Sequence, residues 1–308
     1  MSSTSDPRVV LHPSQNSIRR AFEQVAGIRL DAPDRDGVAA ALEGAPILVS
    51  YPWRDDFATS GLRWVQSVSA GTEQFPIERF REAGIVLTSA RGIHGPQVAE
   101  HALGLLLALT RGIGVAAGQR AERSWRWPEV SELGGTTLGI LGMGVIGEAI
   151  AQRARALGMR VIGTSRDPAG YDGAADEVVA AERMDEVFSR AEAVIVALPG
   201  GEATRRIVGA RQLEALGAGW LVNVGRGSVV DEDALVAALT RGSLRGAGLD
   251  VFEAEPLPES SPLWDLPNVV MTPHIAGASP HYGRRLADLF RRNLEAFRGR
   301  GEWVNRVV

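Results

Sequence analysis

A glycine-rich turn between two short apolar runs is the feature that most constrains how this chain can fold. The apolar run 138–141 leads into the segment GMGVIG at 142–147, a helical stretch follows, and a second apolar run occupies 160–164. Strand, glycine turn, helix and strand in this order form the phosphate-binding unit of dinucleotide-binding folds. Because both flanks have the expected pattern, an ordinary strand-to-helix turn explains these glycines poorly.

Each glycine of this turn has a separate expected role. Gly142 makes the tight turn after the strand, Gly144 lets a pyrophosphate approach the backbone, and Gly147 lets the helix pack close to the strand. The first turn of the helix offers unpaired N–H groups and a partial positive charge to phosphates. We therefore predict that the turn binds a dinucleotide, with Val145 and Ile146 also in contact with it.

The overall composition narrows the classes of function. The chain has 308 residues, enough for two domains of roughly 150 residues each. A net charge of -4 gives no support for binding to nucleic acid or to a membrane surface. Cysteine is absent, which excludes disulfides, thiolate metal sites and a cysteine nucleophile, and the absence of lysine excludes Schiff-base chemistry. We expect no metal site.

The sequence shows no recognisable signal peptide or membrane-spanning segment. Its first residues contain no apolar core of signal-peptide length, and the apolar stretch 102–109 is too short to span a bilayer. A cytoplasmic location is therefore the default expectation.

Strands and helices alternate along most of the chain, which predicts parallel sheets with helical crossovers. In the first part we expect strands at 9–11, 47–50, 64–68 and 85–88, and helices at 17–25, 38–42 and 76–82. In the second part we expect six strands, at 138–141, 161–164, 193–197, 221–224, 246–249 and 269–271, with helices that include 184–190, 211–216 and 231–241. A last helix, 282–298, is expected to return to the first domain.

The segment 96–118 is predicted to form one helix that starts at Pro96. Its residues are apolar around most of the circumference, so several sides of the helix should be buried. Such a helix suits a connection between two domains or a contact with a partner subunit. The sequence WRWPEV after it has the character of a loop.

Three residues with chemically useful side chains follow the last three predicted strands. They are Arg226, Glu255 and His274. Ligands of parallel α/β sheets bind beyond the carboxyl ends of the strands, which is where these residues fall. Taken singly, each has a more ordinary explanation, as a surface charge, a solvated loop residue or a structural histidine. Their joint placement favours catalysis.

The three side chains suit one reaction. A guanidinium binds a carboxylate through two hydrogen bonds, so Arg226 would hold the carboxylate of an acid substrate and polarise its carbonyl. A histidine exchanges protons near neutral pH, so His274 would protonate the carbonyl oxygen on reduction or accept the hydroxyl proton on oxidation. Glu255 would orient the ring and favour imidazolium. Beside a nicotinamide, this set suits hydride transfer between 2-hydroxy acids and 2-ketoacids.

Several long motifs resemble the D-isomer-specific 2-hydroxyacid dehydrogenase family. They are WVQSVSAG, SARGIHGPQVAEHALGLLLALTR, LGILGMGVIGEAIA, LVNVGRGSVVDEDAL and GLDVFEAEPLPESSPLWDLPNVVMTPHIAG, and the resemblance covers nearly the whole chain. The resemblance implies that Arg226, Glu255 and His274 are the catalytic residues and that Asp250 contacts the nicotinamide carboxamide. It further implies a homodimer formed through the 96–118 region and two domains that close over the substrate.

The expected fold class is α/β with two Rossmann-like domains. A dinucleotide-binding domain with a parallel sheet, 98–283, would be inserted into a smaller flavodoxin-like substrate domain, 1–97 and 284–308. The loop 92–94 is expected to border the substrate pocket, and the expected substrate contacts are Ser69, Ala70, Gly71, Ile93, Arg226 and His274. The expected cofactor contacts are Gly142, Gly144, Val145, Ile146, Gly147, Ser165, Arg166, Leu198, Pro199, Thr204, Val224, Gly225, Arg226, Asp250, His274 and Gly277.

The end of the second strand predicts which cofactor binds. An acidic residue that holds the adenosine ribose of NAD is expected about 20 residues after the glycines. Here Ser165 stands at that position and Arg166 follows it. Without the carboxylate a 2′-phosphate is not repelled, and Arg166 can pair with it. The sequence therefore favours NADP(H), while NAD(H) remains possible if Asp167 reaches the ribose instead.

The predicted activity is reduction of a small 2-ketoacid, most like that of glyoxylate or hydroxypyruvate reductases. Two alternatives stay open. One is an enzyme like phosphoglycerate dehydrogenase, and the other is a non-catalytic protein that senses a dinucleotide on the same scaffold. The presence of all three catalytic residue types argues against the sensor.

Overall fold

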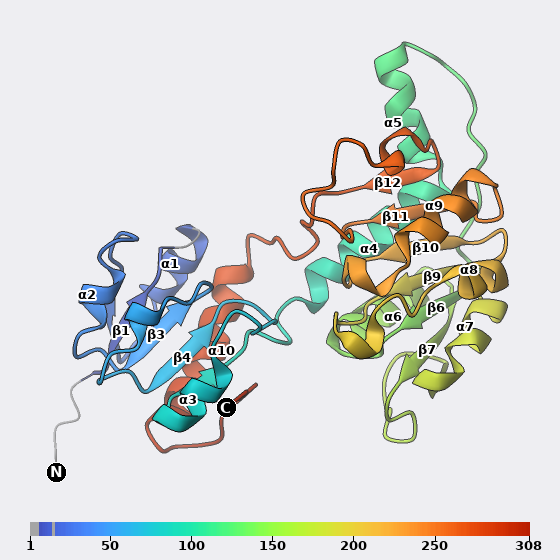
Figure 1. The fold of residues 1–308 in the computed structure, drawn as a ribbon. Coiled ribbons are helices and arrows are strands. Elements are labelled where there is room, and N and C mark those ends of the chain that lie inside the picture. Colours follow the sequence, from blue (N-terminus) through green and yellow to red (C-terminus); the bar gives the residue numbers. More distant parts are fainter. Residues whose placement is uncertain (1–5, 14–15) are drawn as a thin grey trace. The chain divides into compact units, whose positions relative to one another are not determined.

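The computed structural model describes residues 6–13 and 16–308, and these divide into two compact units. The first unit is Met1–Ile93 together with Ser279–Val308, and the second is His94–Ala278 (Figure 1). The two boundaries between the units, after Ile93 and after Ala278, fall a few residues before the domain boundaries expected from the sequence, after 97 and after 283. Each unit contains one fully parallel sheet with helices on both faces, which confirms the predicted α/β class.

The first unit has five strands in the order β2-β1-β3-β4-β5, all parallel. This is the order of flavodoxin-like folds. The strands are β1 (Arg8–Leu11), β2 (Arg29–Asp31), β3 (Ile47–Ser50), β4 (Trp64–Ser67) and β5 (Val86–Thr88). Strand β2 was not predicted, because it has only three residues at the edge of the sheet and none of them is fully buried.

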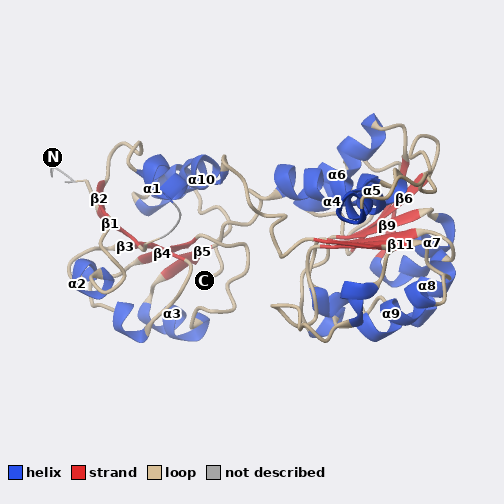
Figure 2. Ribbon diagram, turned by 90° about the horizontal axis from the view of Figure 1, so that it is seen from above, coloured by secondary structure: helices blue, strands red, loops and turns tan. Residues whose placement is uncertain are grey.

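Helices cover both faces of this sheet (Figure 2). One face carries α1 (Asn16–Phe22) and α10 (Tyr282–Phe297), and the other carries α2 (Val38–Leu42) and α3 (Ile77–Ala83). Helix α1 ends three residues before the predicted limit of 25. Helix α10 belongs to this unit, as predicted, because Leu286, Phe290 and Leu294 form one buried face in its core. The ring of Phe290 stacks on Trp64 with 4.7 Å between centroids.

The second unit has seven parallel strands in the order β12-β11-β10-β9-β6-β7-β8. Counted from β6, this is the doubly wound order of dinucleotide-binding domains with one added strand. The strands are β6 (Thr137–Leu141), β7 (Arg160–Ser165), β8 (Glu177–Ala180), β9 (Ala193–Val196), β10 (Trp220–Asn223), β11 (Gly246–Leu249) and β12 (Val269–Met271). Six strands were predicted. The missing one is β8, an edge strand with a single buried residue and therefore a weak apolar pattern.

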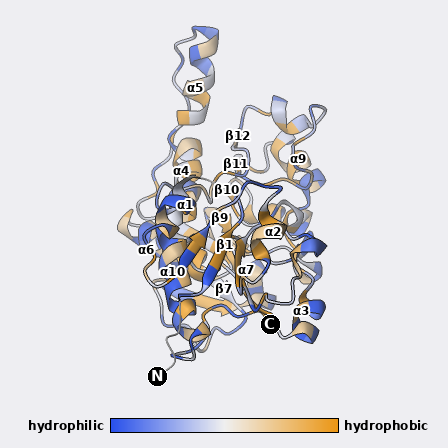
Figure 3. Cartoon of the chain, turned by 90° about the vertical axis from the view of Figure 1, so that its left-hand side faces the viewer, coloured by the Kyte–Doolittle hydropathy of each residue, from blue (hydrophilic) through white to orange (hydrophobic). Residues whose placement is uncertain are grey.

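The helices of the second unit also form two layers (Figure 2). Helices α4 (Gly95–Thr110) and α6 (Val145–Ala156) pack on one face, and α7 (Met184–Arg190), α8 (Ala210–Leu216) and α9 (Glu232–Thr240) pack on the other. The strands of this unit are buried between these layers. In Figure 3, which faces the first unit, hydrophobic colour gathers on the strands around β1. Short 3-10 turns occur at Asp55–Phe57, Ala181–Arg183, Glu202–Thr204, Gly227–Val229 and Pro262–Asp265.

The prediction of a single helix over 96–118 is wrong. The chain forms α4 and then α5 (Ile113–Glu122), with a bend of 65° between them. The break falls at Gly112, whose φ of +66° lies in the left-handed region that glycine adopts without strain. Helix α5 projects away from the sheet of its unit (Figure 1), and only Gln119 of its residues is buried.

No single helix in the described part of the chain is long and apolar enough to cross a membrane. The bent pair α4 and α5 passes such a test by length and composition only.

Truncation of the buried ring that anchors α10 should destabilise the first unit. Phe290 is fully buried, and Phe→Ala changes at such positions cost about 3–5 kcal/mol. In Phe290→Ala, hydrogen exchange of the amides in β1 and β4 should therefore speed up by about two to four orders of magnitude. The exposed Arg292→Ala on the same helix is the control and should leave exchange unchanged. Unchanged protection of β4 in Phe290→Ala would show that α10 is not part of this core.

Candidate active site

The glycine turn after β6 has the geometry that phosphate binding requires. Gly142 has a φ of +98°, and Gly144 is the N-cap of α6. A side chain added at Gly147 would place its Cβ 2.2 Å from the carbonyl oxygen of Gly142, so the helix approaches the strand as closely as it does only because this residue is glycine. A Cβ at Gly144 would meet nothing within 4 Å. The backbone there is open to a ligand, and the site fits a dinucleotide.

The glycine turn is tied to the neighbouring strand β7. The amide of Gly142 donates to Thr164 Oγ1 at 3.0 Å, and the amide of Met143 donates to the Thr164 carbonyl at 2.8 Å. Ser165 ends β7, and its Oγ accepts from the amide of Asp167 at 3.1 Å. The glycine turn therefore lies beside Ser165 and Arg166, the residues predicted to select the cofactor, at the carboxyl ends of β6 and β7.

The loop after β9 lies against the same turn. A Cβ on Gly142 would be 3.0 Å from a methyl carbon of Leu198, which shows how near this loop comes. Thr204 Oγ1 donates to the Pro199 carbonyl at 2.7 Å and closes the loop on itself. Because β6 and β9 are the strands between which the order of the sheet reverses, this is the crevice where such sheets bind ligands.

Arg226 follows β10, as predicted, and its side chain is exposed. Its Nη1 donates to the carbonyl of Gly225 at 2.8 Å, and Asn223 Nδ2 donates to the carbonyl of Arg226 at 3.0 Å. The next residue, Gly227, packs directly on the loop after β11, because a Cβ there would lie 1.9 Å from the Phe252 carbonyl carbon. The Arg226 loop is therefore joined to the loop that carries Glu255.

His274 and Glu255 lie within hydrogen-bonding distance of each other. His274 Nδ1 lies 2.6 Å from Glu255 Oε2, and the other carboxylate oxygen of Glu255 accepts from the amide of Phe252 at 3.0 Å. About half of the His274 side chain is exposed, at 48%. Since Nδ1 faces the carboxylate, Nε2 is the ring nitrogen available for exchange of a proton with a substrate.

Asp250 is buried and bonded to the loop that follows β12. It is only 1% exposed, and its carboxylate accepts from Thr272 Oγ1 at 2.6 Å and from the amides of Ile275 and Ala276, both at 2.9 Å. Its own carbonyl accepts from the amide of His274 at 2.8 Å. Asp250 thus fixes the backbone of the loop that carries His274 through these hydrogen bonds.

This organisation explains an unusual backbone conformation. His274 has a φ of +52°, a region that residues other than glycine seldom occupy and that costs energy unless the surroundings enforce it. The hydrogen bonds around Asp250 supply that enforcement on both sides of His274. Contact of Asp250 with the nicotinamide carboxamide, which the family resemblance implies, stays a prediction. Nothing in the local sequence links Asp250 to Thr272 and the residues that follow.

His101 of α4 joins the same network and was not singled out from the sequence. Its Nε2 lies 2.8 Å from Thr272 Oγ1 and 3.4 Å from Asp250 Oδ1. The helix-to-loop contact is extended by Gln97, whose Nε2 donates to the carbonyl of Gly277 at 3.3 Å. Because His101 and Thr272 are 171 positions apart in the sequence, no sequence spacing could have indicated the contact.

Four residues of the first unit are expected to contact the substrate. Ser69, Ala70 and Gly71 follow β4, and Ile93 follows β5. Ser69 Oγ donates to the carbonyl of Gly71 at 2.5 Å, and the Ser69 carbonyl accepts from the amide of Ala90 at 2.8 Å. Ala70 is exposed. Ile93 packs into the core of the first unit and is 8% exposed. That these residues border the substrate stays a prediction.

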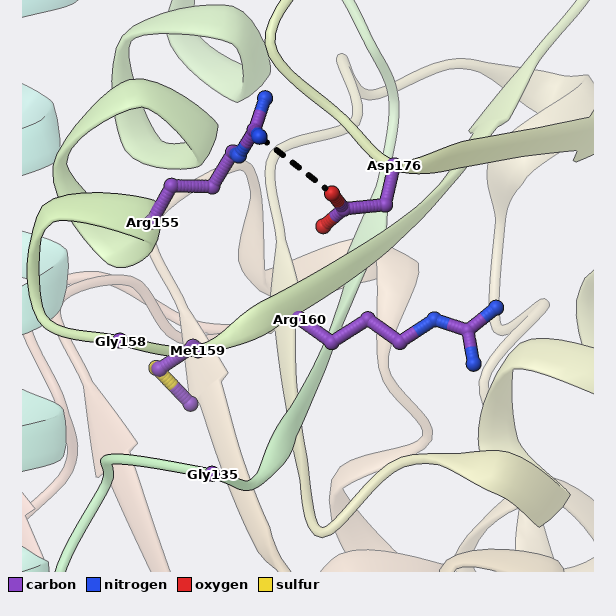
Figure 4. Close-up of a pocket in the computed structure, with 6 residues that line it drawn as sticks. All are labelled: Gly135, Arg155, Gly158, Met159, Arg160 and Asp176. Carbon is purple, nitrogen blue, oxygen red and sulfur yellow. Dashed lines mark ion pairs between the residues drawn. The ribbon is translucent and has the colours of Figure 1, made fainter.

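Two surface pockets lie on the second unit. One of about 470 Å³ lies between α4 and the loop after β12, and its lining includes Glu100, His101 and Thr272. Another of about 430 Å³ lies at the amino ends of β6 and β7, where Figure 4 shows Arg155 of α6 reaching toward Asp176. The second is at the opposite end of the strands from the glycine turn and is therefore separate from the expected cofactor site.

Comparison with known proteins identifies the class that this arrangement defines. Residues 103–276 match the family model described as "D-isomer specific 2-hydroxyacid dehydrogenase, NAD binding domain". A glyoxylate reductase of Korarchaeum cryptofilum is 36% identical over 258 residues, covering 80% of this chain and 75% of that protein. A glyoxylate/hydroxypyruvate reductase B of Yersinia enterocolitica is 38% identical over 292 residues, covering 89% of this chain and 88% of that protein.

Solved structures similar to this chain include a reductase of the same substrate class as these relatives. An NADPH-dependent glyoxylate/hydroxypyruvate reductase from Sinorhizobium meliloti, in complex with NADP and malonate, is 33% identical, with a TM-score of 0.78 over 99% of this chain and 97% of that chain. The chain belongs to the D-isomer specific 2-hydroxyacid dehydrogenase family. It is an oxidoreductase that transfers a hydride between a nicotinamide cofactor and small 2-ketoacids or 2-hydroxyacids.

Removal of the imidazole of His274 should slow the chemical step. In His274→Ala we expect kcat to fall by about 10²–10⁴, the usual contribution of general acid–base catalysis. Glu255→Gln keeps the size of the partner but removes its charge, so it should reduce kcat by less. The exposed His281→Ala serves as control and should keep normal turnover. Near-normal kcat in His274→Ala would remove this residue from the mechanism.

Proposed function

We propose that this protein reduces small 2-ketoacids of the glyoxylate and hydroxypyruvate type, with NADPH as the preferred reductant. The observation that carries the proposal is the His274–Glu255 pair, 2.6 Å apart, at the carboxyl ends of the sheet that also bears the glycine turn. The names of the relatives from Korarchaeum cryptofilum and Yersinia enterocolitica support the substrate class. With NADPH as donor the reaction runs toward the hydroxy acid.

The roles of the side chains follow from their chemistry. When bound, the cofactor supplies a hydride to the carbonyl carbon of the ketoacid. Arg226 binds the carboxylate of the substrate and polarises its carbonyl. His274 gives the proton on Nε2 to the carbonyl oxygen, and Glu255 stabilises the imidazolium that donates it. Asp250 keeps His274 in place through the loop backbone, and contact of Ser69, Ala70 and Gly71 with the substrate stays a prediction.

The end of β7 supports the preference for NADP(H). The alternative was that Asp167 takes the place of the missing ribose-binding acid. In the structure, however, Asp167 Oδ1 accepts from the amide of Gly170 at 3.1 Å, and the Asp167 amide donates to Ser165. Asp167 is therefore already engaged in a local turn. Arg166 stands between the two as an exposed cation. The Sinorhizobium meliloti relative was solved with NADP bound.

A screen of ketoacids with both cofactors tests the proposal. We expect kcat/KM for glyoxylate and hydroxypyruvate to be higher with NADPH than with NADH. In Arg166→Ala, kcat/KM with NADPH should fall by roughly 10- to 100-fold, as expected for a lost charge-assisted hydrogen bond of about 1.5–3 kcal/mol, while the value with NADH stays nearly unchanged. The matched control is Arg160→Ala at the other end of β7.

Three outcomes would contradict the proposal in different ways. A clear preference of the wild type for NADH would remove the cofactor assignment. Faster oxidation of D-3-phosphoglycerate than reduction of any small ketoacid would favour the phosphoglycerate-dehydrogenase alternative. Tight cofactor binding without acceleration by any ketoacid would favour the non-catalytic sensor.

We further propose a homodimer formed through the 96–118 region and the loop that follows it. Helix α5 leaves Ile113 and Val115 exposed, and the next loop exposes Trp125 and Trp127 by 95% and 94%. Large apolar side chains gathered in one exposed region are typical of a protein–protein contact. A second copy of this chain is the partner that the family resemblance implies. A cytoplasmic location stays a prediction from the sequence.

Removal of the two exposed indoles should dissociate the dimer. Each buried tryptophan of an interface contributes about 2 kcal/mol or more, so Trp125→Ala with Trp127→Ala should weaken association by more than about a hundredfold. Light scattering at several protein concentrations measures the change. Trp264→Ala, which removes an exposed tryptophan elsewhere in the same unit, should leave the mass unchanged. A monomeric wild type, or a double variant that stays dimeric, would refute this interface.

A further inference from the structure

The loop between β7 and β8 carries Arg166, and one face of helix α6 holds that loop. The side chains involved are Glu148, Gln152 and Arg155, spaced at i, i+4 and i+7 along the helix. Residues at this spacing lie above one another on the same side of an α-helix. No part of the proposed function explains why this face is bonded so fully to an exposed loop.

Glu148 is the centre of the contact. Its Oε2 accepts from the hydroxyl of Tyr171 at 2.5 Å, and both its oxygens accept from the amide of Ala174, at 3.0 and 3.1 Å. Gln152 Nε2 donates to Oε1 at 3.0 Å. The Tyr171 oxygen in turn accepts from the amide of Ala175 at 2.9 Å. We call Glu148 and Tyr171 the loop clamp, because together they bind two consecutive amides of the loop.

The clamp is in its bonded state at neutral pH. Burial by itself would raise the pKa of Glu148, but the hydrogen bonds from Tyr171, Ala174 and Gln152 outweigh it and lower that pKa. Burial, together with the contact to Glu148, raises the pKa of Tyr171 to about 12. The carboxylate is therefore charged and the phenol protonated, which gives the stronger charge-assisted form of hydrogen bond.

Two further observations show that the loop is built around the clamp. A Cβ on Gly173 would lie 2.3 Å from Glu148 Oε2 and 2.5 Å from the Tyr171 oxygen, so the backbone closes on the pair where only glycine fits. Arg155 Nη1 donates to the carbonyl of Ala174 at 3.1 Å, and its Nη2 lies 3.6 Å from Asp176, the ion pair drawn in Figure 4. The peptide groups of Ala174 are thus held at both the N–H and the carbonyl.

The other end of the loop is fixed as well. Ser165 and Asp167 exchange hydrogen bonds across Arg166, and Asp167 binds the amide of Gly170. Arg166 lies within the closed turn at the end of β7, and the clamp on α6 holds the part of the loop that follows this turn. A cation on a backbone fixed in this way loses less conformational freedom when it binds a phosphate than a cation on a free loop.

We propose that Glu148 and Tyr171 are positioning residues for the choice of cofactor, because they fix the loop that presents Arg166 to the 2′-phosphate of NADP(H). The inference rests on the NADP(H) preference proposed above. NAD(H) has no 2′-phosphate and does not use Arg166. Loosening the loop therefore weakens binding of the phosphorylated cofactor and leaves binding of the other one nearly unchanged.

Equilibrium binding of the two oxidised cofactors tests the clamp without reliance on turnover. Tyr171→Phe keeps the ring and removes only the hydroxyl that joins Glu148 to Ala175. By titration calorimetry, we expect the Kd for NADP⁺ to rise about tenfold and the Kd for NAD⁺ to change less than twofold. Glu148→Ala should have the same effect or a larger one. The control is Glu182→Ala, an exposed carboxylate just after β8, which should change neither Kd.

A double-variant cycle shows whether the effect passes through Arg166. If the clamp acts by positioning Arg166, Tyr171→Phe should have almost no further effect on the NADP⁺ affinity of Arg166→Ala. Equal weakening of both cofactors by Tyr171→Phe, or an additive loss in the double variant, would overturn the proposal. If Glu148→Ala does not fold, the Tyr171→Phe variants carry the test alone.

The failure of the clamp and the failure of the cofactor preference give different results. A wild type that binds NAD⁺ more tightly than NADP⁺ overturns the preference, and with it the role assigned to the clamp. A wild type that prefers NADP⁺, with an Arg166→Ala variant that loses the preference and a silent Tyr171→Phe, leaves the proposed function standing and overturns the clamp alone.

Discussion

The parallel direction of all seven strands in the second unit is the constraint on which the expected active site depends. Parallel strands bring their carboxyl ends to one edge, so loops far apart in the sequence meet there. The turn at Gly142, the cation Arg166, the loop of Arg226 and the base His274 all follow strands of this one sheet. Their order in space is set by the strand order, and the glycines let the backbone come close enough for a ligand.

Two carboxylates then hold the loops that the sheet brings together, and they do so with the same chemistry. Asp250 accepts from the hydroxyl of Thr272 and from two consecutive amides after His274. Glu148 accepts from the hydroxyl of Tyr171 and from an amide of the loop that follows Arg166. A carboxylate removed from water needs such partners, and a loop with exposed amides needs acceptors. The loop amides supply the donors that the carboxylate needs, and the carboxylate supplies the acceptors that the amides need. As a result, the proposed proton donor and the proposed phosphate-binding residue both lie on fixed backbone.

The accuracy of the sequence predictions follows from how local each signal is. Short continuous apolar runs located the buried strands, because these strands are covered on both faces of their sheets. Apolar residues at every third or fourth position located helix α10. These patterns missed β2 and β8, edge strands with few buried side chains. They also joined α4 and α5 into one helix, because both are apolar enough and the bend depends on Gly112 adopting a positive φ. A glycine inside a helical pattern does not by itself show which conformation it takes.

The sequence alone determined the family, the α/β class, the glycine turn and the residues that stand at the strand ends, because each is encoded in a contiguous motif. It also placed Ser165 and Arg166 where a ribose-binding acid is expected. Only the tertiary structure decided what holds these residues: His101 and Thr272 around Asp250, and Tyr171 on Glu148. The physical reason is that a hydrogen bond between side chains 22 or 171 residues apart depends on packing, which no local pattern specifies.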